Sequence, residues 1–124
     1  MNEQICINTF VEVLDELSSV DLQVKLWLNI ENETGLISSY TELMENVSGT
    51  DFNYVVHQLV QDASLKADLV QLLALLDAYE EPKSYVQCRN DVYIVADPVW
   101  KKIRDFAKAI KQIHSVYLKQ LQKR

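Results

Sequence analysis

The stretch DPVWKKIRDFAKAIKQIHSVY, residues 97–117, carries the clearest structural pattern of this 124-residue chain. Its apolar residues recur at alternating spacings of four and three, which is typical of one narrow stripe along an α-helix. The stripe comprises Val99, Ile103, Phe106, Ile110, Ile113 and Tyr117. Asp97 is a good N-cap, and Pro98 suits the next position, where the backbone N–H is unpaired anyway. We therefore predict one helix from Pro98 to the last turn of the chain, about 40 Å long.

The composition favours a single all-α domain over residues 1–124. Apolar residues make up 48% of the chain and charged residues 24%, as in a globular protein that buries a core. Only two glycines and two prolines are present, which is too few for the many turns of a β-sandwich. We expect a mainly helical bundle of five or six helices, with the last helix and residues 65–79 at its centre.

Apolar periodicity and capping residues place the other helices. They are expected over residues 3–17, from Ser19 or Asp21 to about Ile30, from Ser39 to Val47, from Thr50 or Asp51 onward, and over residues 65–79. Ser39 and Glu42 match a capping box, and Ser48-Gly49 indicates a left-handed end of that helix. Residues 69–76 are apolar on nearly every side, which predicts a helix in the middle of the core. Residues 29–35 are polar and indicate a loop.

Residues 84–96 are ambiguous. Short β-branched and aromatic runs surround Arg89-Asn90-Asp91, so a small β-hairpin near residues 85–95 fits the pattern. An isolated hairpin is marginal unless it packs on helices. We favour a hairpin or irregular extended chain over a short helix here.

Charge is distributed unevenly. Residues 1–82 contain 15 acids and 2 bases, whereas residues 83–124 contain 3 acids and 10 bases. The last helix carries a basic row: Lys101, Lys102, Arg104, Lys108 and Lys111. An overall pI near 4.8 disfavours nucleic-acid binding. We interpret the row as a solvated face or as partners for the acids, and acids such as Asp15 and Glu16 as solvated.

No motif for catalysis or for a metal is present. Glycine occurs only at positions 35 and 49, so a P-loop, a dinucleotide fingerprint and a GxSxG elbow are excluded. His57 and His114 are isolated, and Cys6 and Cys88 lack ligand spacing. We therefore expect each histidine to be a structural or surface residue, and both cysteines to be reduced, largely buried thiols. We predict no enzyme activity, no catalytic residues, no cofactor and no metal.

Two further features concern the location of the protein and its core. The N-terminus has no basic region typical of a signal peptide, and no apolar run is long enough to span a membrane, so we place the protein in the cytoplasm. Trp27 and Trp100 lie beside apolar stripes, and we interpret both as anchors of the core.

Several segments together resemble a known family. These are the Trp27-Leu-Asn segment, Ser38-Ser-Tyr-Thr-Glu-Leu43, Asp51-Phe52, and Ala96-Asp-Pro-Val-Trp-Lys-Lys-Ile103 in a small acidic helical chain. The combination is similar to bacterial immunity proteins of contact-dependent growth inhibition and related polymorphic toxin systems. The resemblance implies a non-enzymatic cytoplasmic inhibitor that binds a cognate toxin domain, commonly a nuclease, and blocks its active site or its access to substrate. Contact residues vary between such pairs, so the resemblance supplies no site residues.

Charge and loop placement supply the candidate site. Five acids with no intervening base fall between residues 31 and 51: Glu31, Glu33, Glu42, Glu45 and Asp51. A nuclease cleft that holds phosphate is basic, and an acidic surface would speed its association. We predict that these five acids bind the toxin domain. A helical adaptor or regulatory subunit of another complex is the main alternative, and a small enzyme that assembles its site from scattered carboxylates is a weaker one.

Overall fold

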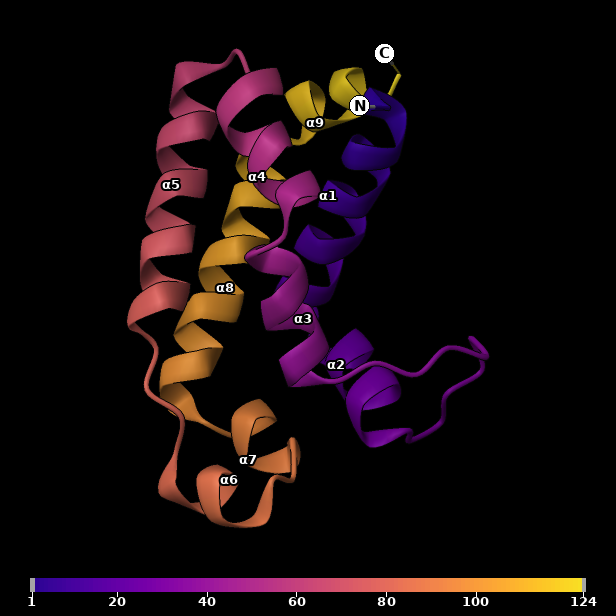
Figure 1. Cartoon of the computed structure of the whole chain (residues 1–124), viewed down its shortest axis with the longest axis vertical. Coiled ribbons are helices and arrows are strands. Elements are labelled where there is room, and N and C mark those ends of the chain that lie inside the picture. Colours follow the sequence, from indigo (N-terminus) through magenta and orange to yellow (C-terminus); the bar gives the residue numbers. More distant parts are fainter. Residues whose placement is uncertain (1, 124) are drawn as a thin grey trace.

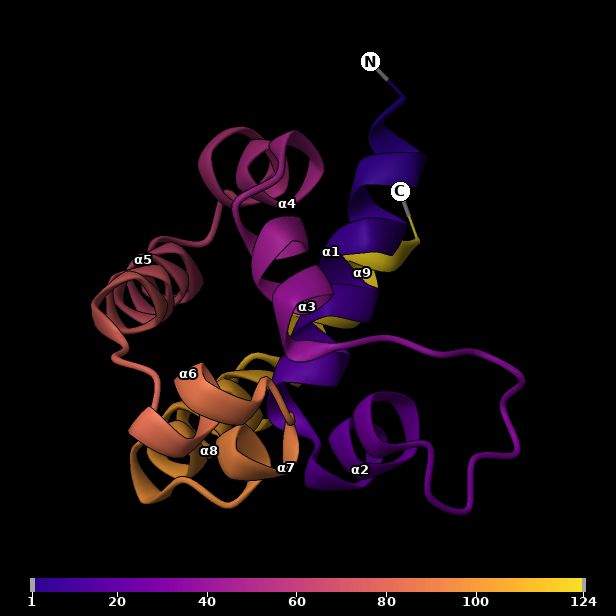
Figure 2. The same ribbon diagram turned by 60° about the horizontal axis from the view of Figure 1, so that its bottom comes forward.

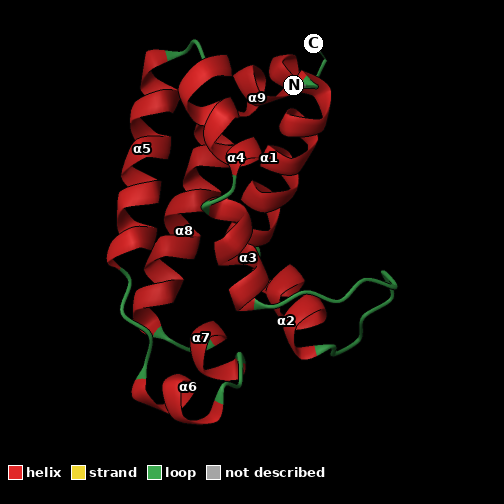
Figure 3. Cartoon of the chain, viewed as in Figure 1, coloured by secondary structure: helices red, strands yellow, loops and turns green. Residues whose placement is uncertain are grey.

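The computed structural model describes residues 2–123, and over this range the chain is all-α, as predicted, with nine α-helices, one π-helical turn and no strand. The elements are α1 (Glu3–Ser18), α2 (Val20–Leu28), α3 (Tyr40–Val47), α4 (Thr50–Tyr54), η1 (Val55–Leu59), α5 (Ala63–Ala78), α6 (Lys83–Cys88), α7 (Val92–Val95), α8 (Pro98–Ile113) and α9 (Ser115–Gln122). The helix count exceeds the predicted five or six because the chain bends at several points between short helices. Figure 3 shows the loops that separate them.

Helix α8 is the middle element of the bundle. It runs antiparallel between α1 and α5, and α3 and α4 pack on α1 from the front (Figure 1). Helices α2, α6 and α7 close one end, whereas α9 turns across the other end and contacts α1. Figure 2 shows that α5 lies at the edge, beside α8 but away from α1 and α2. The prediction of a central last helix therefore holds for α8, but the prediction of a central 65–79 helix is wrong.

Side-chain acceptors cap most of the long helices, because the first N–H groups of a helix have no partner within it. Asn2, Ser19, Ser39, Asp62 and Asp97 each accept a bond from a backbone N–H of the first turn. The caps predicted at Ser19, Ser39 and Asp97 are thus confirmed.

The predicted cap at Thr50-Asp51 is wrong. Gly49 is the N-cap of α4, so no side chain accepts a bond from the first turn, and its φ of −72° is not left-handed. Ser48 ends α3 in a right-handed conformation instead, so the expected left-handed termination at Gly49 is also wrong. The chain passes directly from α3 into α4, and one extended glycine is enough to change its direction.

The predicted hairpin near residues 85–95 is not seen, and two short helices, α6 and α7, replace it. Arg89 adopts φ = +55° and ends α6, which reverses the chain without any strand pairing. Each short helix buries one large residue, Tyr85 in α6 and Ile94 in α7. The apolar runs that suggested strands therefore bury single anchors at one end of the bundle, and helical geometry satisfies the backbone there.

The final helix differs from the prediction in two ways. It breaks at His114, where φ is −105° and ψ is 23°, so that α8 and α9 are separate. The buried face of α8 comprises Trp100, Ile103, Arg104, Ala107 and Ile110. Phe106 is half-buried, and Val99 and Ile113 are exposed. The predicted apolar stripe lies about one residue away from the buried face, because Phe106 and Ile113 are larger and more apolar than the buried Ala107 and His114.

Aromatic rings form the core at the lower end of the bundle. Five rings form this cluster, and the ring centroids of contacting pairs lie 5.2 to 6.2 Å apart: Trp27, Tyr40, Tyr79, Tyr85 and Trp100. Both tryptophans are buried, as predicted. The tilted and edge-on arrangements are the ones that aromatic quadrupoles favour.

Gln23 is fully buried beside this cluster and has all its polar groups paired. Its side-chain N–H groups donate to the carbonyls of Glu16 and Leu17, at 2.9 and 3.1 Å. Its Oε1 accepts from Trp100 Nε1 at 3.1 Å and from the Arg104 guanidinium at 3.0 Å. This network joins α1, α2 and α8. It also explains why Arg104 is buried, although we expected it on a solvated face or paired with an acid. Burial lowers the pKa of the Arg104 guanidinium.

Candidate partner-binding surface

The segment between α2 and α3, residues 29–39, is an ordered loop that projects from one end of the bundle (Figure 1). Asn29, Glu31 and Gly35 all have positive φ, so the chain turns sharply three times. The Asn32 amide lies at the centre of these turns. It donates to the backbone carbonyl of Leu36 at 2.5 Å and accepts from the N–H and hydroxyl of Thr34. Side-chain bonds of this kind replace the helix ladder in Asx turns.

The base of the loop is fixed to the core. Ser38 N–H donates to the carbonyl of Leu26 at 3.0 Å. The Glu16 carboxylate accepts from both the Ser38 hydroxyl and Trp27 Nε1, at 3.0 and 2.8 Å. Glu16 is therefore half-buried and bonded, and the prediction that it is merely solvated is wrong. One carboxylate on α1 thus ties the loop to a core tryptophan.

The loop presents aliphatic side chains to solvent. Ile30 is 51% exposed, Leu36 67% and Ile37 74%, and the last two values are among the highest for large apolar residues of the described chain. Glu31 and Glu33, two of the predicted site residues, are exposed on the same loop. Exposed apolar groups rimmed by charge are typical of protein-interaction sites. The three aliphatics were missed in the sequence, although an Ile and a Leu-Ile pair inside a polar, glycine-containing loop are a visible signal.

Glu42 and Glu45 form a second acidic pair. They lie three residues apart on α3 and are exposed, opposite the buried Tyr40, Leu43 and Val47. Because residues three apart on a helix are neighbours, the two carboxylates act on the same part of the surface. The 29–39 loop ends where α3 begins, so four of the five predicted acids lie on two consecutive elements (Figure 1).

Asp51 is separate from the other four acids. It lies in the first turn of α4, is half-buried, and its Oδ1 accepts from the buried Cys6 thiol at 3.4 Å. Burial, together with that bond, raises the pKa of Cys6. The Asp51 carboxylate is thus directed to α1. Cys88, by contrast, is exposed, so the prediction of two largely buried thiols holds only for Cys6.

A hollow of about 560 Å³ between α3 and the end of α5 adds two more acids. Its walls include Tyr40 and Met44 on one side and Asp77, Tyr79 and Glu81 on the other. Burial and the neighbouring Glu81 carboxylate raise the pKa of Tyr40, and burial and the bond to Asp97 raise that of Tyr79. Asp77 and Glu81 were missed because nothing in the sequence places them beside α3.

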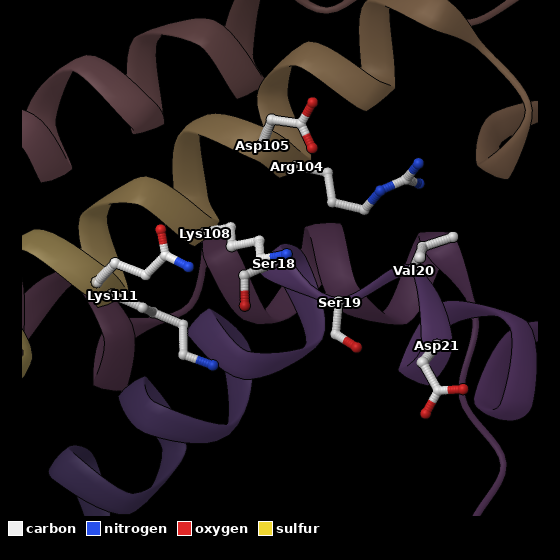
Figure 4. A pocket seen from close by; sticks show the side chains of 9 residues that line it. Ser18, Ser19, Val20, Asp21, Arg104, Asp105, Lys108 and Lys111 are labelled. Atoms are coloured by element: carbon white, nitrogen blue, oxygen red, sulfur yellow. The ribbon is translucent and has the colours of Figure 1, made fainter.

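The basic row of α8 is largely used within the molecule. Lys111 pairs with Asp15 at 2.8 Å and Lys101 with Asp105 at 2.8 Å, which confirms partnership with acids for these two lysines. The Asp15 side chain is still 44% exposed, so it is both solvated, as predicted, and paired. A hollow of about 410 Å³ lies where α8 faces the turn between α1 and α2 (Figure 4). Asp21 and Asp105 line it together with Arg104 and Lys108, so its charge is mixed.

The two histidines differ. His114 is buried, and its Nε2 lies 2.7 Å from Asp68 Oδ2, which joins the α8–α9 break to α5; His57 is exposed on η1. Within residues 2–123, no group of three His, Cys, Asp or Glu side chains is placed to share a metal ion. None of the helices described is both long and apolar enough to cross a bilayer. No family model matches this chain, and no curated protein or solved structure shows a significant match to it.

Proposed function

We propose that this protein is a bacterial immunity protein that binds a cognate toxin domain in the cytoplasm and blocks it, with the 29–39 loop as the main contact. The observation that carries the proposal is the loop itself: it is braced by Asn32, anchored through Glu16, and exposes three aliphatic side chains beside two carboxylates. A preorganised loop loses little entropy on binding. Such an element serves recognition of another protein.

The chemistry of the loop favours a basic partner. Aliphatic side chains bury against apolar surface and supply affinity, whereas carboxylates at the rim steer association and set salt dependence. Glu31 and Glu33 on the loop, and Glu42 and Glu45 on the α3 helix that follows it, are four exposed acids on consecutive elements. A nuclease toxin has a basic cleft because it must hold phosphate. The combination supports occlusion of such a cleft.

A helical adaptor for another complex is the second candidate, because the same loop would serve any basic partner. The decisive experiment uses the toxin domain that the proposal expects the neighbouring gene to encode. We expect the purified protein to bind that domain and to suppress its activity. Absence of binding to it by the wild-type protein would contradict toxin neutralisation and favour the adaptor.

Matched variants test the surface. Ile37→Ser should raise the dissociation constant for the toxin domain at least ~10-fold, because it removes an apolar contact and the complex then dissociates faster. Ile113→Ser is the control, because Ile113 is a 72% exposed isoleucine on a different face. The pair Glu31→Gln with Glu33→Gln should slow association and reduce its dependence on salt. Glu12→Gln with Glu80→Gln removes two exposed charges elsewhere and should do neither.

A further inference from the structure

Helix α5 has an outward face that no other element between residues 2 and 123 covers. Its inward face is buried by Leu65, Leu69, Leu72 and Leu76 against α8 and η1. On the outer face Val70 is 45% exposed and Leu75 38% exposed, and Ala67, Gln71, Ala74 and Ala78 are exposed beside them. One charged residue lies between Lys66 and Asp77 in the sequence, Asp68, and its carboxylate is turned to His114 at the edge of this face. A helix that is apolar all round is normally buried on both sides.

The uncovered face continues into a groove. Leu75 and Ala78 line this groove from α5 and Val99 and Lys102 line it from α8, together with residues of the connecting segments that include Glu80, Pro82 and Asp97. Its volume is about 560 Å³. Figures 1 and 2 both place α5 at the edge of the bundle, with no other element on its outer side.

We propose that a second copy of this chain covers α5, with the two α5 helices packed antiparallel about a two-fold axis. A two-fold interface must be complementary to itself. Lys66 lies one turn from the start of α5 and Asp77 one residue from its end. An antiparallel pair places Lys66 of each copy beside Asp77 of the other, on the same flank of the interface.

The charge distribution favours a second copy over a different partner. The chain has a net charge of −6, so most pairs of faces on two copies would oppose acids. The outer face of α5 is free of charge along its centre and carries opposite charges at its two ends. The exposed alanines let the two backbones approach closely, and Val70 and Leu75 fill the flanks. A basic partner would find carboxylates at the groove end of this face, at Asp77, Glu80 and Asp97, but none along its centre.

The size of the face sets the strength of the dimer. Helix α5 has 16 residues and is therefore ~24 Å long. One helix face with a short groove buries less than the ~800 Å² per partner of a standard interface. The dimer is accordingly weak, with a dissociation constant in the micromolar range or above. It is independent of the proposed toxin binding, because the 29–39 loop lies on a different side of the molecule from α5 (Figure 2).

Sedimentation equilibrium of the full chain tests the proposal. From ~10 µM to ~1 mM the mean mass should rise from 14.3 kDa toward twice that value. Ala74→Glu should raise the dissociation constant at least ~10-fold, because it places a charge at the centre of the interface. Gln120→Glu adds the same charge on exposed α9 and should leave the constant unchanged. A constant mass of 14.3 kDa, or an effect of both variants alike, would overturn the proposal.

Charge reversal tests the antiparallel arrangement. Lys66→Glu and Asp77→Lys should each weaken the dimer, because each places like charges together. The double variant should have a dimer dissociation constant close to that of the wild type, because the opposite charges are paired again. Lys66→Glu also removes the bond from Lys66 Nζ to the carbonyl of His57, but that bond lies within one chain and is lost in the single and the double variant alike. A double variant as weak as the single ones contradicts this arrangement. Circular dichroism of each variant identifies any that fails to fold, and Ala74→Lys then replaces Ala74→Glu.

Discussion

Helices α5 and α8 have the same length, 16 residues, and lie antiparallel side by side, yet they use their sequences differently. Helix α8 separates its residues by chemistry: its inner face is apolar around one satisfied arginine, and its outer face carries lysines and an aspartate. Helix α5 buries four leucines and leaves valine, leucine and alanines on the outside. The contrast shows that apolar content alone does not place a helix at the centre of a bundle. Helix α8 is central because other helices pack on two of its sides, whereas α5 is packed on one side.

The largest expected effect tests the buried face of α8. Trp100 is fully buried in the aromatic cluster, and its Nε1 is bonded to Gln23. Trp100→Ala should lower the free energy of unfolding by about 3–5 kcal/mol through lost apolar contact and a cavity. Val99→Ala, one residue away and 54% exposed, should cost less than about 0.5 kcal/mol.

Urea denaturation of both variants gives the comparison. Phe106→Ala should fall between them, because Phe106 is half-buried. If Phe106→Ala cost as much as Trp100→Ala, the stripe predicted from the sequence, and not the face seen in the structure, would be the one that holds the core.

The fold was predictable where local chemistry decides it. Polar side chains cap α1, α2, α3 and α8 within the first turn, and the sequence predicts the cap residues of the last three. The break at His114 was not predictable, because it depends on Asp68, 46 residues away. The same holds for Arg104, whose burial requires Gln23 on another helix. Non-local partners set these features, and periodicity in one segment does not reveal them.

The second prediction compares the two faces of α5. Leu72 has no exposed surface, whereas Leu75, three residues later, is 38% exposed. Leu72→Ala should cost about 2–5 kcal/mol, and Leu75→Ala about 1 kcal/mol or less. Thermal or urea unfolding at low protein concentration measures both in the monomer. Equal, large losses would mean that α5 is covered on both sides within a single chain.

The third prediction compares the N-caps of the two helices. Asp97 of α8 accepts from Val99 N–H at 3.1 Å and from the Tyr79 hydroxyl at 2.5 Å. The Asp62 carboxylate, which caps α5, accepts from one described donor, Leu65 N–H, at 2.9 Å. Asp97→Ala should therefore cost about 1–2 kcal/mol and Asp62→Ala about 0.5–1 kcal/mol. Urea midpoints in the opposite order would show that the Tyr79 bond adds nothing to the cap.

The candidate surface was predictable only in part. A run of acids without bases points to residues 31–51, and four of those acids are indeed exposed. The pattern does not show that Asp51 turns toward Cys6, because the two residues are 45 positions apart. Nor does it reveal the role of Glu16, which anchors the loop through Ser38 and Trp27. Charge is visible in a sequence, but the direction of a side chain depends on the packed fold.

The last prediction concerns the charged outer face of α8, which α5 lacks. The hydrogen bond from Lys101 lowers the pKa of Asp105 below its ordinary 3.8, and the charges of Lys101, Arg104 and Lys108 act in the same direction. A carboxyl whose pKa is lowered by folding stabilises the folded state above its ordinary pKa and loses that contribution as the pH falls through the lowered value.

Asp105→Asn should therefore be slightly less stable than the wild type at pH 7, and the difference should vanish as the pH falls below 3.8. Added salt should shrink the difference, since both partners are exposed. Asp77→Asn, on α5, has no ion pair to lose within one described chain and serves as the control at pH 7, at a protein concentration low enough to keep the chain monomeric. Urea titrations across this pH range decide the matter: a difference that persisted in acid would have to come from helix propensity or packing at position 105, because the carboxyl is then uncharged in both the folded and the unfolded chain.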